Sequence, residues 1–547
     1  MRTTIKIVIL LFFICTSMSG TSSPDMEKYM RQHALIWEQL PMQWNEGAFL
    51  GNGLVGMMVY ADSTLNALVF HLGRPDVTDH RKAPYRKTSI GTEEADKMVD
   101  FCRLDIGKML LFPEGKILSG TFYLDIYNAE LTGHLKTDKG DLTFHAYTPQ
   151  PEEVNIVEVS SGIPYRWKGI PGNPCSPRIR VFPHLKEKLK YKDNPVPVVN
   201  QKDKEGSWVQ SLLAGGDYAT YWKEVPDGKS RSVLYISTAN EVPASSLSLA
   251  KAIKTVEAAQ ITGTKLLKQK TRQWWNAYHE RSFLSIPDKK LENFYFIQMY
   301  KLATCSHPDG PAMDVMGTFF KLSPWPSFWW NLNIQLTYMP IGPANRMEQG
   351  KNFQRLMDEV FPSLVRSIEP CKIGDYTWAL QNYYMYLRYA GADWQDIKQQ
   401  VVPKALDAFA VFDKILCYKE NTWHLTHIES PEYERFQKYN DSNYGLASLS
   451  WLLQTLIACH DRTSSTHPDY ARWKEILTRL APYPTNENGL MIAANKPLEK
   501  SHRHYSHLLA FYPFRLLHPD VPENRKLLEK SIEHWLSLED GKGLAGY

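Results

Sequence analysis

The sequence lacks a surplus of charge of either sign, and this limits the partners it can have. Over 547 residues, 63 Lys and Arg stand against 59 Asp and Glu, which leaves a net charge of +4. Proteins that bind nucleic acid concentrate basic residues on one face, so this near balance gives no electrostatic support for such a partner. Charged residues make up 22% and apolar residues 43% of the chain, as expected of a globular protein.

Long apolar runs are missing too, except at the N-terminus. Arg2 and Lys6 precede the apolar stretch 7–14, and small residues follow it up to Ser19-Gly20. A charged start, a short apolar run and a small-residue exit are typical of a secretory signal peptide, and this run is too short to span a bilayer. We expect residues 1–20 to be a signal peptide cleaved near Ser19-Gly20. The protein would then be exported, periplasmic or extracellular, without stable membrane insertion.

Cysteine pairs and several catalytic signatures are also absent. Of seven Cys, Cys15 lies in the predicted signal peptide, and the other six are scattered without a C-x-x-C pair, so no zinc or redox motif is supported. Buried free thiols are favoured over disulfides. The sequence contains no G-x-S-x-G elbow, Walker loop or dinucleotide fingerprint. We expect neither a metal ion nor a cofactor.

Short apolar stretches alternate with turn residues from about residue 35 to residue 238. This alternation predicts a large antiparallel β-sandwich over residues 25–244. The clearest strands are expected at 56–60, 65–70, 120–126, 141–147 and 232–237.

From about residue 245 the apolar residues recur at helical spacing. A helical linker is expected over 245–284, followed by helices separated by loops at 291–303, 353–365, 378–389, 403–416, 444–458 and 470–480. Helical hairpins with long polar and aromatic loops are typical of an (α/α)6 barrel, in which the loops at one end form a cleft. We therefore predict a β-sandwich followed by a helical barrel over residues 285–547.

The first group of candidate site residues is rich in Trp and Asn. Trp325, Trp329 and Trp330 precede Asn331 and Asn333. In an extended segment the two Asn would lie on one side, where their amides could hold a water molecule or a sugar hydroxyl. The alternative is a loop that packs its aromatic rings and caps a helix. The chain holds 16 Trp and 29 Tyr, whose rings stack on sugars or fill cores, and we add Trp378 as a substrate-binding candidate.

The second group is an acidic loop around Ser430-Pro431-Glu432, between two predicted helices. Cleavage of a glycosidic bond needs a protonated carboxyl group beside the leaving oxygen. Glu429, Glu432 and Glu434 all qualify by residue type. The alternative is an acidic helix start, which Glu after Ser-Pro also favours.

The third group is the donor-rich run His502-Arg503-His504. Metal binding is not favoured, because no acidic ligand lies nearby and no H-E-x-x-H motif occurs. Recognition of sugar hydroxyls by His502, Arg503 and His504 fits better. The alternative is a hydrogen-bond network between helices.

These groups occur in an order that resembles glycoside hydrolase family 95, the inverting α-L-fucosidases, which also include α-L-galactosidase activity. Residues 50–59 look like its L-G-N-G-x-x-G-x-M-V strand, and residues 331–340 are similar to its N-I-N-x-Q-M-N-Y-W-P segment. Residues 430–432 match its S-P-E, and residues 502–508 match its H-R-H-x-S-H-L. The resemblance runs from about residue 43 to the end.

The resemblance implies a β-sandwich followed by an (α/α)6 barrel, and it implies roles. Glu432 would be the general acid, and Asn331 and Asn333 would hold the attacking water. The family's base is an Asp in a D-G-N-F-G motif beyond the His-rich run. This motif does not occur in the chain. We therefore expect a divergent and C-terminally truncated member. Local candidates for a replacement base are Asp314, Asp375 and Asp441.

The predicted function is an exported, α-L-fucosidase-like glycosidase that cleaves terminal sugars from an oligosaccharide or glycan with inversion. Two alternatives stay open. The chain could be another glycosidase or a phosphorylase of the same architecture, the latter needing a basic phosphate pocket. It could also be a catalytically inactive carbohydrate-binding remnant. The sugar, the linkage and the oligomeric state are not predicted.

Overall fold

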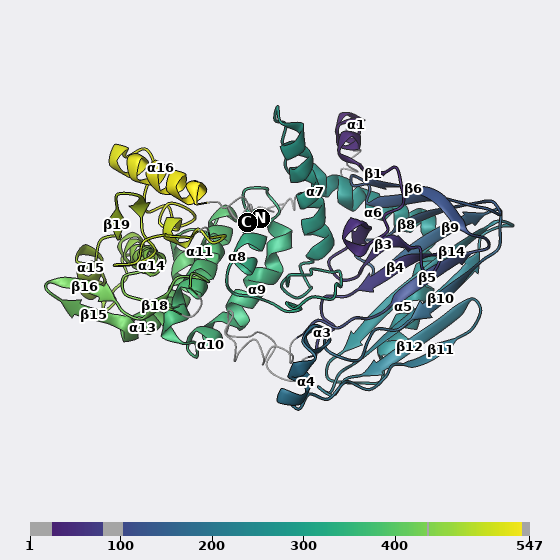
Figure 1. The fold of residues 1–547 in the computed structure, drawn as a ribbon, viewed down its shortest axis with the longest axis horizontal. Helices are drawn as coiled ribbons and strands as arrows, with labels where there is room; N and C mark the ends of the chain where they lie inside the picture. Colours follow the sequence, from purple (N-terminus) through teal and green to yellow (C-terminus); the bar gives the residue numbers. More distant parts are fainter. Residues whose placement is uncertain (1–23, 80–101, 435–436, 501, 539–547) are drawn as a thin grey trace, which may run out of the picture.

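The computed structural model describes residues 24–79, 102–434, 437–500 and 502–538. The predicted signal peptide lies outside the described residues. Figure 1 shows two β-sheets at one end of the molecule and a helical region at the other, with α7 (Lys289–Cys305) between them. This order places the strands before the helices in the sequence, as predicted.

The larger sheet is antiparallel throughout. Its strands, in spatial order, are β1 (Leu35–Trp37), β6 (Ile117–Asp125), β7 (Glu130–Thr137), β8 (Asp141–Tyr147), β9 (Val154–Ser161), β14 (Arg231–Glu241), β13 (Asp217–Pro226), β12 (Glu205–Ser211) and β11 (Val198–Gln201). Strand β7 shows why these residues form a sheet with one covered face. Leu131, Gly133 and Leu135 are buried, while the residues between them are exposed, which is the alternation of a strand with one face on a core.

The smaller sheet is antiparallel as well and faces the first across an apolar core. Its strands, in spatial order, are β10 (Tyr165–Ile170), β5 (Lys108–Pro113), β4 (Ala67–Gly73), β3 (Gly56–Asp62) and β2 (Ala48–Gly51). Phe70 of β4 meets Phe144 of β8 edge to face, with ring centroids 5.5 Å apart. Aromatic pairs of this geometry contribute beyond the area that they bury.

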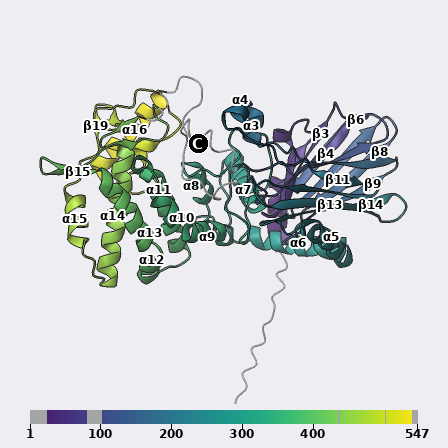
Figure 2. The same cartoon turned by 90° about the horizontal axis from the view of Figure 1, so that it is seen from below.

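The segment expected to be a linker forms a layer on the larger sheet. Helix α5 (Ser248–Thr262) packs Val256 against Val233 and Tyr235 of β14, and Figure 2 shows α5 and α6 (Thr264–His279) lying along the strands. Trp275 of α6 is fully buried in the core of the sandwich. The segment is therefore helical, as its apolar spacing predicts. It does not act as a spacer between two domains, because its apolar side packs on the larger sheet.

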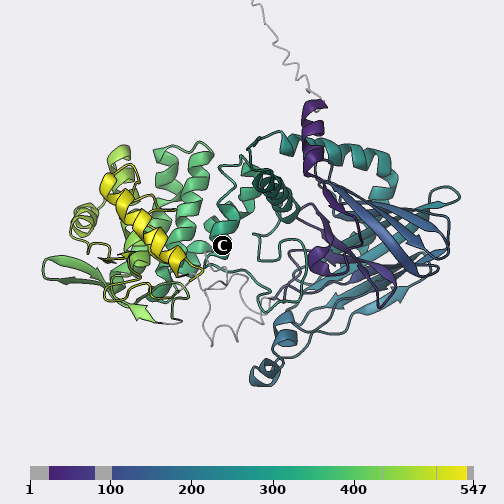
Figure 3. The same cartoon turned by 45° about the horizontal axis from the view of Figure 1, so that its top comes forward.

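The helical region has its own core. Its helices are α8 (Asn333–Tyr338), α9 (Lys351–Glu359), α10 (Phe361–Val365), α11 (Ile373–Tyr389), α12 (Trp394–Gln400), α13 (Val402–Phe412), α14 (Asn443–Thr463), α15 (Tyr470–Thr478) and α16 (Pro522–Ser537). Figures 1 and 3 both show α16 on this region, away from the sheets. The single helix expected at 353–365 is divided at Val360, because Pro362 favours the start of a new helix.

Residues 50–59 join the sandwich to α7. The Asn52 side chain donates to the carbonyl oxygens of Pro149 and Glu152, each at 2.8 Å, and accepts from two backbone N–H groups of its own turn. Gly53 donates its backbone N–H to the Thr304 carbonyl at the end of α7, at 3.0 Å. The L-G-N-G stretch is thus a structural joint: its buried polar groups are paired and its glycine contacts the backbone of the next region.

The remaining expectations about the chain concern thiols and membranes. Cys102, Cys371 and Cys459 are buried and Cys175, Cys305 and Cys417 are partly or fully exposed, and none of the six is recorded in a disulfide among the described residues. Within the described ranges, no helix combines the length and apolarity needed to cross a bilayer.

Candidate active site

One cavity brings together residues from all three candidate groups. It has a volume of about 260 Å³. It is lined by Val315, Ser323, Trp325, Trp329, Asn331, Leu332, Asn333, Glu432, Arg503 and His504. Three loops build it: the segment between α7 and α8, the loop after β17 (Ile428–Glu429), and the segment before the short 3-10 helix Ser506–Leu508. Residues far apart in the sequence thus share one concave, polar and aromatic surface, which is the usual form of a ligand site.

The first wall consists of tryptophans and amides. Trp325 and Trp329 meet edge to face with centroids 5.1 Å apart. Asn331 is only 7% exposed, and its Oδ1 accepts no hydrogen bond from any described residue. A buried acceptor without a protein partner is unfavourable unless water or a ligand supplies a donor. Asn331 is therefore prepared to accept a hydrogen from a bound molecule.

The extended geometry expected for the two asparagines is wrong. Asn333 begins helix α8, and Leu332 before it has φ of 61°, in the left-handed region that bulky residues rarely adopt. This turn, rather than the period of a strand, brings Asn331 and Asn333 to the same cavity. Leu332 itself lines the cavity as well.

The opposite wall carries Glu432 in a left-handed turn, with φ of 56°. Its Oε2 lies 2.9 Å from Arg503 Nε, contacts the Nη2 of the same guanidinium, and lies 3.1 Å from His504 Nε2. Burial alone would raise the pKa of Glu432, but the contacts with His504 and Arg503 outweigh it and hold the pKa at about 2. These basic neighbours therefore favour the ionised form of Glu432.

His502 supports this wall without lining the cavity. Its Nε2 donates to the Pro431 carbonyl at 3.0 Å, and its ring stacks on that of His504 with centroids 5.2 Å apart. Trp535 of α16 donates its indole N–H to the His502 carbonyl at 2.8 Å. Burial lowers the pKa of His502 to about 4, so the ring is neutral near pH 7. The contact with sugar predicted for His502 is replaced by support of the Glu432 loop.

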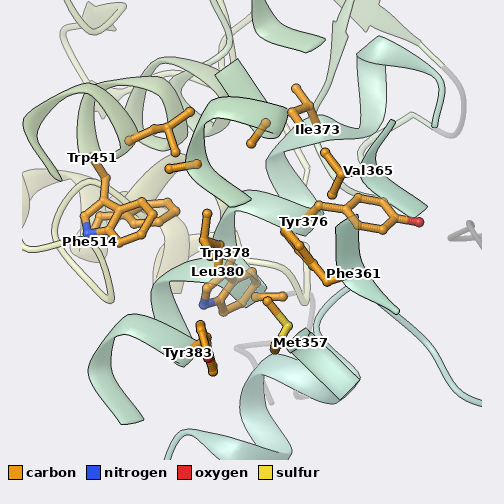
Figure 4. Packing of buried hydrophobic residues seen from close by; sticks show 14 of the residues in the cluster. Met357, Phe361, Val365, Ile373, Tyr376, Trp378, Leu380, Tyr383, Trp451 and Phe514 are labelled. Atoms are coloured by element: carbon orange, nitrogen blue, oxygen red, sulfur yellow. The ribbon is translucent and has the colours of Figure 1, made fainter. Parts of the chain in front are cut away.

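Trp330 and Trp378 do not reach the cavity either, which corrects their prediction as sugar-binding residues. Trp330 is fully buried and stacks on Tyr376, with centroids 5.2 Å apart. Trp378 is 2% exposed and lies within the core of the helical region (Figure 4). Both indoles fill the space between helices, because large apolar rings contribute most when they are fully removed from water.

The other carboxylates considered from the sequence lie outside the cavity. Asp314 pairs with Arg103 at 3.1 Å, Asp375 accepts from the Tyr444 hydroxyl at 2.6 Å, and Asp441 lies 2.7 Å from His424 Nδ1. Glu434 pairs with Lys496 at 2.9 Å, and burial raises the pKa of Glu429, whose Oε1 lies 3.4 Å from the Cys371 thiol. Among the described lining residues, Glu432 is the only carboxylic acid.

Sequence reasoning missed Val315 and Ser323 as lining residues. Both lie in the irregular segment between α7 and α8, where no periodicity indicates which way a side chain points. Among the described residues, no group of three or more His, Cys, Asp or Glu is arranged to hold a metal ion.

Comparison with known proteins gives a match over the helical region. The profile of the glycosyl hydrolase family 95 catalytic domain matches residues 367–544. Residues 367–544, 178 of the 547 residues of the chain, are thus similar to the catalytic domain of glycoside hydrolase family 95. The match contains Glu432, Arg503 and His504, whereas Asn331 and Asn333 precede it. The match supports a glycoside-active enzyme, and the matched residues supply one wall of the cavity.

Comparison with solved structures gives matches over most of the chain. A protein described as a kojibiose phosphorylase from the human microbiome has a TM-score of 0.54 and 9% identity, over 81% of this chain and 67% of its own. A bacterial glucoamylase in complex with acarbose has a TM-score of 0.42 and 9% identity, over 82% of this chain and 69% of its own. The first confirms the predicted fold class, a β-sandwich followed by an (α/α)6 helical region. No curated protein matches the chain in sequence.

Proposed function

We propose that this chain is an exported exo-glycosidase that hydrolyses a terminal α-L-fucosyl or closely related linkage with inversion. Glu432 is the proton donor, and Asn331 and Asn333 hold the attacking water. The observation that carries the proposal is that Glu432 and the two amides line one cavity from opposite segments of the chain. The order of the four family 95 motifs supports the sugar class, and the N-terminal pattern of residues 1–20 supports export.

The cavity supplies two of the parts that inverting hydrolysis needs. A protonated Glu432 would give its proton to the oxygen of the leaving sugar as the bond from that oxygen to the anomeric carbon breaks. A water molecule would attack the anomeric carbon from the other face and release one proton to solvent water, because the described lining residues include no second carboxylate to take it up. The Asn331 Oδ1, buried and without a partner among the described residues, would accept one hydrogen of this water, and the amide of Asn333 would orient it further.

Glu432 has to gain a proton before it can act. Arg503 and His504 favour its ionised form, so substrate binding has to weaken at least one of these contacts. Removing water from the cavity when a sugar enters would act in the same direction, because desolvation favours the neutral carboxyl group. Substrate binding itself would thus favour the protonated form of Glu432.

The test is Glu432→Gln, assayed on a fucosylated oligosaccharide and on an aryl α-L-fucoside with a good leaving group. We expect kcat/KM on the oligosaccharide to fall by about 10²- to 10⁴-fold, and to fall much less on the activated fucoside, which needs little protonation. Glu434→Gln is the matched control, because Glu434 pairs with Lys496 outside the cavity. Equal losses on both substrates would rule out the acid role of Glu432.

The stereochemistry and the nucleophile are tested in the same assay. Proton NMR of the first product should show the β-anomer released from an α-linked substrate. Addition of inorganic phosphate should leave the rate unchanged and yield no sugar phosphate. Accumulation of a glycosyl phosphate would identify a phosphorylase instead.

A further inference from the structure

Two nitrogens of Arg503 donate to a single oxygen of Glu432, and His504 Nε2 lies 3.1 Å from the same oxygen. Arg503 Nε and Nη2 and His504 Nε2 all approach Oε2, while Oε1 accepts no hydrogen bond from a described residue. A guanidinium that directs two N–H groups at one oxygen does not use the bidentate geometry that suits a carboxylate or a sulfate best. A second oxyanion entering the cavity would therefore find a donor able to bind it better than it binds Glu432.

The side chains of Arg503, Glu432 and His504 differ in their exposure to solvent. The Arg503 side chain is 44% exposed, whereas those of Glu432 and His504 are 12% and 6% exposed. Arg503 is therefore the partner that a molecule in the cavity can reach most easily, whereas Glu432 and His504 are largely covered by protein. Arg503 is thus an exposed cation that pairs with a nearly buried carboxylate.

The position of the acid fixes the part of the ligand that Arg503 can reach. If Glu432 is the proton donor, it lies beside the oxygen of the leaving sugar. Arg503 contacts the same carboxylate, so it faces the leaving sugar rather than the terminal sugar that is cut off. This step rests on the proposed function.

We propose that the cavity accepts a glycan whose leaving sugar carries an anionic group, a carboxylate or a sulfate ester, and that this group binds Arg503 and thereby releases Glu432 to act as an acid. The ligand anion and Glu432 compete for one guanidinium, so binding of one weakens the hold on the other by the same free energy. A neutral leaving sugar lacks this effect. Arg503 would then determine specificity, and Glu432 would be activated only by the correct substrate.

The groups that face Glu432 make Arg503 the decisive one. His504 lies on the same segment and is nearly buried, and His502 is engaged by the Pro431 carbonyl. Lys496 is directed to Glu434 and Glu499. Among the described residues around Glu432, Arg503 is therefore the exposed cation that contacts its carboxylate, and a substitution of Arg503 removes this contact.

The first experiment measures binding to the full chain by NMR titration with D-glucuronate, D-glucose and inorganic sulfate. We expect glucuronate to bind about tenfold more tightly than glucose, as one charge-assisted bidentate contact would give. Arg503→Gln should abolish this preference, and Arg503→Lys should keep only part of it. Equal affinity for the two sugars, or a preference that survives in Arg503→Gln, would overturn the proposal. Binding of sulfate as tight as that of glucuronate would show a free-anion site and overturn the anionic-sugar assignment.

The second measurement follows Glu432 itself, by carbon NMR of labelled glutamate side chains assigned with Glu432→Gln. Saturating glucuronate should raise the pKa of Glu432 in the wild type but not in Arg503→Gln, where the pKa should already be raised. Titration of L-fucose in the same samples separates the two proposals. Binding of fucose without any effect of glucuronate would leave the proposed function standing and refute the anionic subsite. An effect of glucuronate without fucose binding would do the reverse.

Discussion

Ser430 Oγ lies 2.8 Å from Ser506 Oγ, and both hydroxyl groups are buried. This hydrogen bond joins the loop that carries Glu432 to the segment that carries Arg503 and His504. Together with the bond from His502 to the Pro431 carbonyl, it makes two motifs that are distant in sequence into one rigid wall. The orientation of the candidate acid therefore depends on residues that do not line the cavity.

Ser430→Ala and Ser506→Ala should each lower the free energy of unfolding by about 1–2 kcal/mol, because each leaves a buried hydroxyl group without its partner. Each should also reduce kcat more than it changes KM, since the wall that orients Glu432 loosens. Urea denaturation and steady-state kinetics measure both effects. Because the two hydroxyl groups act as a pair, the double variant should lose less than the sum of the single variants.

Ser363→Ala is the matched control for this pair. The Ser363 side chain is exposed and its hydroxyl donates to the carbonyl of Val360, just before its own helix, so its loss should alter neither stability nor kinetics. Fully additive effects of Ser430→Ala and Ser506→Ala would show that the hydrogen bond between Ser430 and Ser506 does not couple the two segments.

Substitution of the adjacent residues Trp329 and Trp330 by Phe should affect substrate binding and stability differently. Trp329→Phe should raise KM several-fold with little change in stability, because the Trp329 ring lines the cavity. Trp330→Phe should lower stability by about 1–3 kcal/mol with KM nearly unchanged, because it leaves a gap in a fully buried core. Thermal unfolding and kinetics on one activated fucoside give both values. A reversed pattern would mean that Trp330 contacts the sugar.

The general architecture could be predicted from the sequence, because it follows from periodicity. The alternation in β7 reflects one covered face, and the helical spacing of apolar residues indicates α11 and α14, although the first halves of both helices are buried on all sides. These patterns are local. Composition could not show which tryptophans line the cavity. Trp329 and Trp330 are neighbours of the same type, and only the packing of Tyr376 against Trp330 separates core from cavity.

The details of the candidate site were less predictable for a similar reason. Leucine rarely adopts a positive φ, so the sequence gives no sign of the left-handed turn at Leu332. The spacing of the two Asn therefore predicts an extended segment where α8 begins. The pairing of Glu432 with Arg503 and His504 is tertiary, and it changes the state of the carboxyl group from the neutral acid that the motif suggested to an ion.

Arg503→Gln should shift the pH dependence of kcat/KM measured on a neutral substrate. The alkaline limb of this profile reports loss of the proton from the acid in the free enzyme. Removing the cation raises the pKa of Glu432 from its value of about 2, so the acid keeps its proton to higher pH and the limb moves to higher pH. We expect a shift of at least about one unit, the usual effect of an adjacent opposite charge.

Arg366→Gln serves as the control for this profile, because Arg366 pairs with Asp407 on the surface of the helical region. Its profile should match that of the wild type. An alkaline limb that stays in place in Arg503→Gln would mean that Arg503 does not govern the protonation of the acid.

Gly53→Ala should destabilise the protein far more than Gly228→Ala, although both glycines have positive φ, of 82° and 91°. A Cβ at Gly53 would lie 2.3 Å from the Ser306 carbonyl carbon and 2.5 Å from the His307 nitrogen, whereas a Cβ at Gly228 would meet open space. We therefore expect Gly228→Ala to cost about 1–2 kcal/mol from the left-handed backbone alone. Gly53→Ala should cost at least about 3 kcal/mol, since backbone cannot move aside as a side chain can. Urea denaturation compares the two, and equal losses would show that the sandwich does not depend on this contact with the end of α7.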